Sequence, residues 1–130
     1  FKKNDKREEI LIENLPIDAL LFDLGKKTIK LYKDIVAKAN TIFVNGPVGV
    51  YEEEISNKST KALWKAIEDE PGFTVIGGGD TVTSFTIFTD IKKINYVSTA
   101  GGALIRYLSG IELPLIRALK KSAGKGERLL

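Results

Sequence analysis

Short apolar runs alternate with longer amphipathic stretches along the middle of the chain, and this alternation restricts the fold more than any other feature. Residues 41–44, 73–76 and 94–97 have the length and the β-branched and aromatic content of buried strands. Residues 28–40 and 59–67 carry apolar side chains three and four positions apart, which is typical of amphipathic helices. Strands and helices that alternate in this way predict parallel βαβ units with helices packed on the sheet.

The predicted fold class is α/β, a Rossmann-like three-layer sandwich with a mostly parallel sheet, of which this chain forms part of a domain. At 130 residues the chain is long enough for one hydrophobic core and too short for two. Helix starts are expected after an N-cap at Asn57 or Ser59, at Asp80, and at Gly101. Residues 17–22 are predicted as an additional strand.

The composition excludes several classes of chemistry. The chain has no cysteine and no histidine, so it lacks disulfides, thiolate nucleophiles, imidazole bases and the usual zinc ligands. A bound metal must then have oxygen ligands, which favours Mg²⁺ held by one or two carboxylates together with substrate phosphates. No apolar run approaches the roughly 20 residues that span a bilayer, and no signal-like segment follows the basic start. We expect a cytoplasmic protein without a membrane partner.

Nucleic acid is not an expected partner, although the net charge is +3. Nucleic-acid binding requires clustered basic residues with aromatic stacking platforms. Here the 20 basic residues are interleaved with 17 acidic ones, and the aromatic residues fall mostly at predicted core positions. A basic interaction domain is therefore a weak alternative.

A glycine-rich turn, Gly77-Gly78-Gly79-Asp80-Thr81, connects a predicted strand to a predicted helix. Glycines let a phosphate approach the backbone closely, and the free amides at a helix start attract anions. Asp80 and Thr81 add a carboxylate and a hydroxyl suited to magnesium and to phosphate oxygens. By itself the glycine triplet would equally suit a tight turn, with Asp80 only capping the helix.

The loop at residues 45–52 follows another predicted strand and should reach the same edge of the sheet. Asn45 could donate a hydrogen bond to phosphate, and Glu52 could accept hydrogen bonds from ribose hydroxyls. Val48 and Tyr51 offer apolar surface to a pocket. The plain alternative is that Glu52 begins a solvated acidic run.

The loop at residues 98–102 follows the last predicted strand and ends in Gly101-Gly102 before a helix. It supplies a second set of amide donors at the same edge. Two such sets facing one cleft would suit phosphoryl transfer, in which a protein chiefly positions groups and stabilises charge.

Taken together, residues 23–28 (Asp-Leu-Gly-Lys-Lys-Thr), 45–52, 77–81 and 98–103 resemble the carboxyl-terminal part of the phosphoglycerate kinases in order and spacing, and Leu113-Pro114 continues the likeness. The resemblance implies reversible phosphoryl transfer between 1,3-bisphosphoglycerate and ADP, with Mg²⁺, in glycolysis. It implies that residues 1–130 are part of the carboxyl-terminal nucleotide-binding domain, and that the parent protein is a monomer.

The resemblance also implies a role for each site residue. The nucleotide-binding residues would be Asn45, Gly46, Val48, Tyr51, Glu52, Gly78, Gly79, Asp80 and Thr81. Asp80 would also be the metal ligand, and Gly101 and Gly102 would be catalytic amide donors beside the transferring phosphoryl group. The sequence departs from the family pattern at Ala100 and Ser59, which both replace glycines, and at Arg106, which stands where an acid is common.

We expect these 130 residues to be inactive alone. The amino-terminal domain that binds 3-phosphoglycerate, and a lysine that contacts the nucleotide, would lie outside them by this resemblance. The absence of methionine, even at the first position, agrees with a chain that is processed or belongs to a longer parent. The alternative function is a noncatalytic nucleotide-binding module that binds ADP or ATP and never joins a kinase partner domain.

Overall fold

The computed structural model describes residues 1–3 and 6–126 of the chain. Its centre is a sheet of three parallel strands, β3 (Thr41–Asn45), β4 (Phe73–Gly77) and β5 (Tyr96–Ser98), which are neighbours in that order. Two helices make the crossovers, α2 (Lys58–Asp69) between β3 and β4 and α3 (Gly79–Phe88) between β4 and β5. The predicted parallel βαβ units are therefore confirmed.

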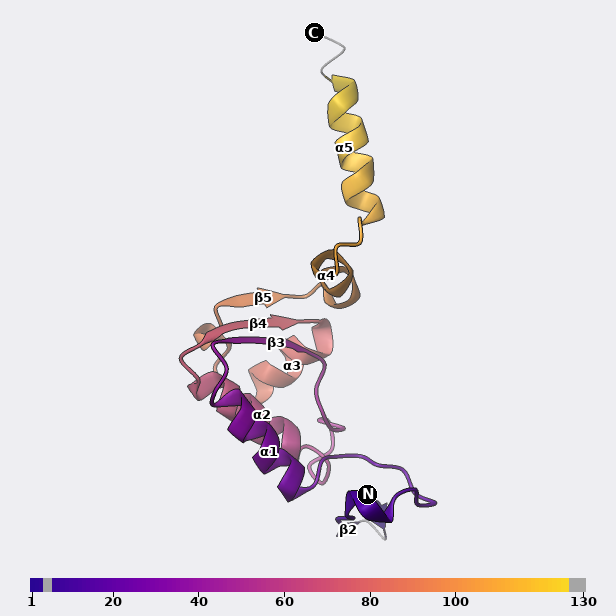
Figure 1. Cartoon of the computed structure of the whole chain (residues 1–130), viewed down its shortest axis with the longest axis vertical. Helices are drawn as coiled ribbons and strands as arrows, with labels where there is room; N and C mark the ends of the chain where they lie inside the picture. Colours follow the sequence, from indigo (N-terminus) through magenta and orange to yellow (C-terminus); the bar gives the residue numbers. More distant parts are fainter. Residues whose placement is uncertain (4–5, 127–130) are drawn as a thin grey trace.

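The crossover helices and α1 (Lys26–Val36) lie on one face of the sheet, as Figure 1 shows. The remaining elements are β1 (Lys2–Lys3), β2 (Lys6–Arg7), η1 (Ile12–Asn14), η2 (Ile91–Lys93), α4 (Gly101–Leu108) and α5 (Pro114–Gly126). Strands β1 and β2 pair in an antiparallel hairpin. Among the residues that the structure describes, no helix is both long and apolar enough to cross a lipid bilayer.

Helix starts follow the sequence closely. Helix α2 has Asn57 at its N-cap position, α4 begins at Gly101, and α3 begins at Gly79, one residue before the predicted start. The side chain of Asn57 nevertheless makes no capping hydrogen bond, so the predicted position is right and the expected contact is missing.

The strand predicted at residues 17–22 is wrong. This segment has no regular secondary structure, and its Leu20 and Leu21 are exposed. A strand needs a neighbouring strand to pair its backbone groups. The carbonyl of Phe22 instead accepts a hydrogen bond from the amide of Val50, which lies in a loop (3.0 Å).

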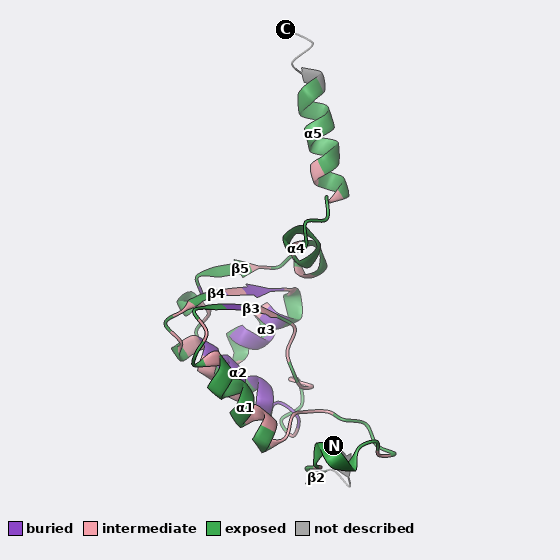
Figure 2. Cartoon of the chain, viewed as in Figure 1, coloured by how far each residue is buried: buried purple, intermediate pink, exposed green. Residues whose placement is uncertain are grey.

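The hydrophobic core lies between the sheet and helices α2 and α3, where Figure 2 shows the buried residues. Trp64, Ile76 and Phe85 are at most 1% exposed, and the rings of Trp64 and Phe85 are 5.6 Å apart between centroids. Side chains alternate along β3, so Ile42 is buried while Phe43 points away from the helices and is exposed.

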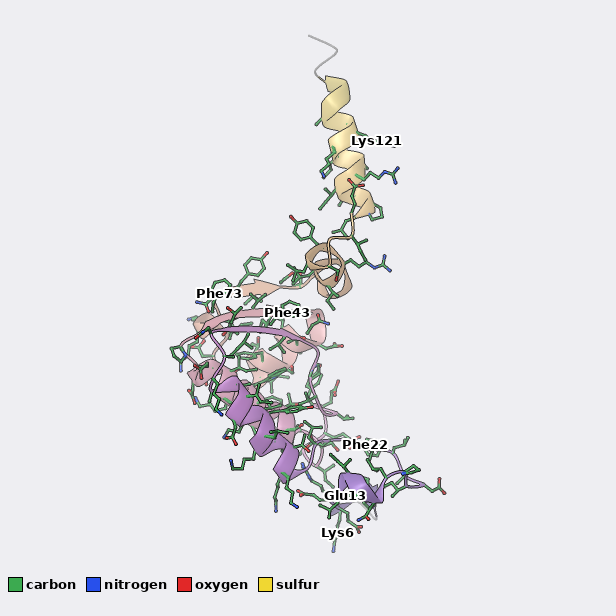
Figure 3. The ribbon with its side chains drawn as sticks, viewed as in Figure 1. Lys6, Glu13, Phe22, Phe43, Phe73 and Lys121 are labelled. Carbon is green, nitrogen blue, oxygen red and sulfur yellow. The ribbon has the colours of Figure 1, made fainter. Side chains whose placement is uncertain are left out.

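The opposite face of the sheet is apolar and exposed within the described residues. Phe43, Phe73 and Tyr96 are 44%, 53% and 53% exposed, and the first two are labelled in Figure 3. Parallel sheets usually bury both faces under helices. The predicted α/β fold is thus confirmed, and the described residues supply the sheet and one helical layer of the expected sandwich.

Three loops meet at the carboxyl ends of the strands, as the sequence predicts. The amide of Gly78 donates to the carbonyl of Ser98 at 2.9 Å, which joins the loops after β4 and β5. A Cβ added to Gly101 would lie 3.1 Å from the Cα of Gly78, and one added to Gly78 would lie 3.0 Å from Oδ1 of Asn45. The backbones of the loops after β4 and β5 therefore pack against each other at Gly78 and Gly101, and the Asn45 side chain from the end of β3 packs against both.

Gly78→Ala should destabilise the fold, because Gly78 has a φ of +97° and its Cβ would press on Asn45. We expect the free energy of unfolding to fall by about 1–3 kcal/mol, measured by urea denaturation. Gly79→Ala is the matched control, since it meets no atom within 4 Å and lies inside α3. Equal losses in the two variants would contradict the prediction.

Glu68 links α2 to the segment that follows α3. Its carboxylate contacts Lys65 Nζ at 2.5 Å and Lys93 Nζ at 3.5 Å, and accepts from the amide of Asp90 at 3.0 Å, while its side chain is only 6% exposed. The hydrogen bond from Lys65, followed by the one from Asp90, lowers the pKa of Glu68 to about 2.

Protonation of Glu68 should therefore weaken the fold in acid. Because its folded pKa lies below that of an unfolded glutamate, its stabilising contribution is complete above about pH 4.5 and disappears as pH falls toward about 2. Urea denaturation between these pH values should show a smaller loss of stability for Glu68→Gln than for the unaltered chain. Parallel pH profiles would contradict this.

Candidate functional site

The start of α3 carries backbone amides that face the end of the sheet. Its first internal hydrogen bond runs from the amide of Val82 to the carbonyl of Gly78 (3.0 Å), so the amides of Gly79, Asp80 and Thr81 precede the ladder. These amides and the helix dipole together favour an anion. Gly78, and not Asp80, occupies the N-cap position, which removes the capping interpretation of Asp80 and leaves an exposed carboxylate in the first turn.

Thr81 fastens the first loop to α3. It is fully buried, and its Oγ1 accepts a hydrogen bond from the amide of Gly46 at 2.6 Å. Its carbonyl accepts from Ser84 Oγ at 3.0 Å, and that hydroxyl accepts in turn from Trp64 Nε1 at 3.0 Å. The Thr81 hydroxyl is thus directed at the loop after β3 and away from solvent, and the loop is tied to the core.

The glycines of the three loops fall into two groups. A Cβ added to Gly77 would lie 2.9 Å from Leu104 Cδ2, one added to Gly78 3.0 Å from Asn45 Oδ1, and one added to Gly101 3.1 Å from the Cα of Gly78, so these three glycines are closely packed. Gly79 and Gly102 have no such neighbour within 4 Å. A side chain would therefore meet no crowding at these two positions, so Gly79 and Gly102 are not required by packing.

The start of α4 repeats the arrangement of α3. The amide of Leu104 donates to the carbonyl of Ala100 at 3.3 Å, so the amides of Gly101 and Gly102 precede the helical ladder. Ala100 replaces a glycine of the family pattern, but its φ of −82° is an ordinary one for alanine. The substitution therefore leaves both amide donors in place.

Acidic groups gather near Tyr51. Burial, followed by the charges of Glu52 and Asp80, raises the pKa of Tyr51. The carboxylates of Glu52 and Asp80, which come from different loops, both lie close enough to act on this phenol. The predicted ribose ligand and the predicted metal ligand thus both contribute to the raised pKa of Tyr51.

Gly46 and Val48 have a different environment. They line an apolar cavity of about 300 Å³ between α1, α2 and β3, together with Tyr32, Ile35, Val36, Val44, Leu63, Trp64 and Ile67. None of the other predicted site residues lines this cavity. The structure therefore places these two residues at an apolar cavity, apart from the amides at the start of α3.

The residues present fit magnesium that arrives with a nucleotide better than a resident ion. Among residues 1–3 and 6–126 no group of three or more acidic, histidine or cysteine side chains could hold a metal. Asp80 supplies one exposed carboxylate beside open amides. Magnesium is commonly held by one or two carboxylates together with substrate phosphates, which matches this donor set.

Asp23 contacts the start of α2 and lies beside Gly49 of the loop at residues 45–52, although the sequence assigned it no role. Its carboxylate accepts from the amides of Leu24 (2.9 Å) and Ser59 (3.3 Å). The sequence feature that could have indicated a role for Asp23 is its place between the apolar residues Phe22 and Leu24. A charge in such a run needs partners when it is buried.

Known proteins with a similar sequence or fold point to one family. The family model described as "Phosphoglycerate kinase" matches residues 1–111. The chain is 43% identical over 109 residues to phosphoglycerate kinase from Nitratidesulfovibrio vulgaris, covering 84% of this chain and 28% of that protein. It is 41% identical over 119 residues to the enzyme from Methanopyrus kandleri, covering 92% and 29%.

Solved structures agree. Phosphoglycerate kinase from Pyrococcus horikoshii superposes with a TM-score of 0.68 at 42% identity, over 80% of this chain and 25% of that one. The Coxiella burnetii enzyme gives a TM-score of 0.68 at 40% identity, over 75% and 25%. The chain thus spans between a quarter and a third of the length of these relatives. Its strands, its strand-end glycines and these matches show that the chain belongs to the phosphoglycerate kinase family.

Proposed function

We propose that residues 1–130 form part of the carboxyl-terminal domain of a phosphoglycerate kinase and bind ADP or ATP with Mg²⁺. In this role they serve phosphoryl transfer between 1,3-bisphosphoglycerate and ADP in glycolysis. The observation that carries the proposal is the meeting of two helix starts, those of α3 and α4, across the contact between Gly78 and Gly101. Two sets of amide donors at adjacent helix starts suit a polyphosphate.

Each predicted nucleotide-binding residue has a proposed role. The amides of Gly79, Asp80 and Thr81 bind phosphate oxygens, and Asn45 orients the phosphates from the end of β3. Glu52 accepts the ribose hydroxyls. Tyr51 offers apolar surface beside Glu52, while Gly46 and Val48 line the separate apolar cavity between α1, α2 and β3. Gly78 lets a phosphate approach the backbone closely.

Asp80 would hold the magnesium ion that accompanies the nucleotide. The bound ion supplies positive charge that neutralises phosphate oxygens. Gly101 and Gly102 donate their amides toward the phosphoryl group that moves, because they lie at the second helix start. The chain's own residues thus bind, orient and partly shield the phosphates.

The site residues supply no cationic side chain. None of the residues placed in the site is lysine or arginine, so charge compensation in phosphoryl transfer must come from Mg²⁺ and from groups elsewhere. We propose that an amino-terminal domain binds 3-phosphoglycerate and supplies those groups in a monomeric cytoplasmic parent enzyme. The same lack of cations favours the second candidate function, a noncatalytic nucleotide-binding module.

Binding of Mg-ADP should perturb the amide signals of residues 78–81 in a magnetic resonance titration. Asp80→Asn should raise the Kd for ADP about tenfold when magnesium is present, which corresponds to ~1.4 kcal/mol, and should leave it unchanged in chelator. Asp34→Asn, which alters an exposed carboxylate on α1, is the control. Amide signals of residues 78–81 that stay fixed at saturating Mg-ADP would contradict the proposal.

The 130-residue chain should not catalyse phosphoryl transfer alone, because a missing group that stabilises transition-state charge costs roughly 10²-fold or more in rate. A coupled assay with ATP and 3-phosphoglycerate should give no turnover above the background without protein. Turnover that rises in proportion to the concentration of the chain would show that the needed cations are already present.

A further inference from the structure

Asp23 is a buried charge next to the loop that carries Glu52. Its side chain is only 5% exposed, and it forms an ion pair with Arg7, whose Nη1 lies 2.5 Å from Oδ2 of Asp23. The other guanidinium nitrogen of Arg7 donates to the carbonyl of Leu24. Both charges of the pair are largely removed from water, so they depend on each other and on their hydrogen bonds.

The same carboxylate caps helix α2. The amide of Ser59 lies 3.3 Å from each carboxylate oxygen, and the Ser59 hydroxyl also donates to Oδ1. Asn57 occupies the N-cap position of α2 without a side-chain hydrogen bond, so a residue 36 positions before Ser59 in the sequence performs the capping. Ser59 stands where the family resemblance expects glycine, and its hydroxyl gives this chain an additional donor to Asp23.

Asp23 also sets the path of the loop at residues 45–52. A Cβ added to Gly49 would lie 2.6 Å from Oδ1 of Asp23 and 2.5 Å from the carbonyl oxygen of Ser56. The amide of Val50 donates to the carbonyl of Phe22 at 3.0 Å, beside Asp23. The loop is therefore held against the carboxylate just before it reaches Glu52.

We propose that Asp23 is a positioning residue that holds this loop, and with it Glu52, in the geometry that receives the ribose of a nucleotide. Arg7 and Ser59 are its partners. The proposal rests on the proposed function for the role of Glu52. The position of the loop itself follows from the contacts of Asp23.

A carboxylate is required at this position because four donors converge on it. They are Arg7 Nη1, the amide of Leu24, and the amide and hydroxyl of Ser59. An ionised carboxylate offers about four acceptor sites. An asparagine amide offers one oxygen acceptor, and its NH2 group would face some of these four donors. Asp23→Asn should therefore break some of these four hydrogen bonds while keeping the size of the side chain.

Two ligands separate a positioning role from a general loss of structure. Mg-ADP contains the ribose, whereas magnesium pyrophosphate can contact only the phosphate-facing amides. In titrations of the 130-residue chain, Asp23→Asn should weaken Mg-ADP about tenfold and magnesium pyrophosphate less than about twofold. Asp34→Asn, which makes the same chemical change at an exposed ion pair, should change neither. Equal weakening of both ligands, or no weakening of Mg-ADP, would overturn the role in ribose binding.

Amide hydrogen exchange tests the position of the loop without a nucleotide. The amides of Gly49 and Val50 donate to Thr60 Oγ1 and to the Phe22 carbonyl, and they should exchange several-fold faster in Asp23→Asn. The amide of Gly46, which donates to Thr81, should not change. If the unaltered chain binds neither ligand, the proposed function fails, while the exchange rates still decide whether Asp23 holds the loop.

Ser59→Ala keeps the backbone donor to Asp23 and removes only the hydroxyl. It should raise the exchange rates of the Gly49 and Val50 amides by a smaller factor than Asp23→Asn does. It remains informative if Asp23→Asn fails to fold. Unchanged exchange at Gly49 and Val50 in a folded variant of either kind would overturn the proposal.

Discussion

The buried hydroxyl of Thr81 connects the core of this chain to the loops that surround its site. It accepts the amide of Gly46, while the Thr81 carbonyl accepts Ser84 and Ser84 accepts the indole of Trp64. A buried polar group without a hydrogen-bond partner lowers the stability of the fold. Each member of this chain of hydrogen bonds therefore depends on the next. These hydrogen bonds fasten the loop after β3 and the start of α3 to the core.

The site is built mainly from backbone. Glycines that touch one another, Gly78 and Gly101 above all, let two helix starts approach. The predicted site also contains two acidic side chains, Glu52 and Asp80, whose charges contribute to the raised pKa of Tyr51. In the proposed function such a site positions a phosphate and its cation, and the remaining positive charge comes from residues beyond this chain.

The two faces of the sheet differ in how far they are covered. One face is covered by α1, α2 and α3, while Phe43, Phe73 and Tyr96 remain exposed on the other. The chain also spans at most about a third of the relatives that it matches. An incomplete cover for an apolar sheet and an incomplete set of charges for phosphoryl transfer both fit a chain that contributes one part of a larger enzyme.

Local patterns in the sequence determined the α/β class, the three parallel strands and the helix starts at Gly79 and Gly101 to within one residue, because periodicity and glycine punctuation act over a few positions. They also placed the three loops at one edge of the sheet. Only the tertiary structure decided that residues 17–22 lack a strand, that Asp23 caps α2, and that the Thr81 hydroxyl turns toward Gly46. These outcomes depend on partners as many as 36 positions away, which no local pattern specifies.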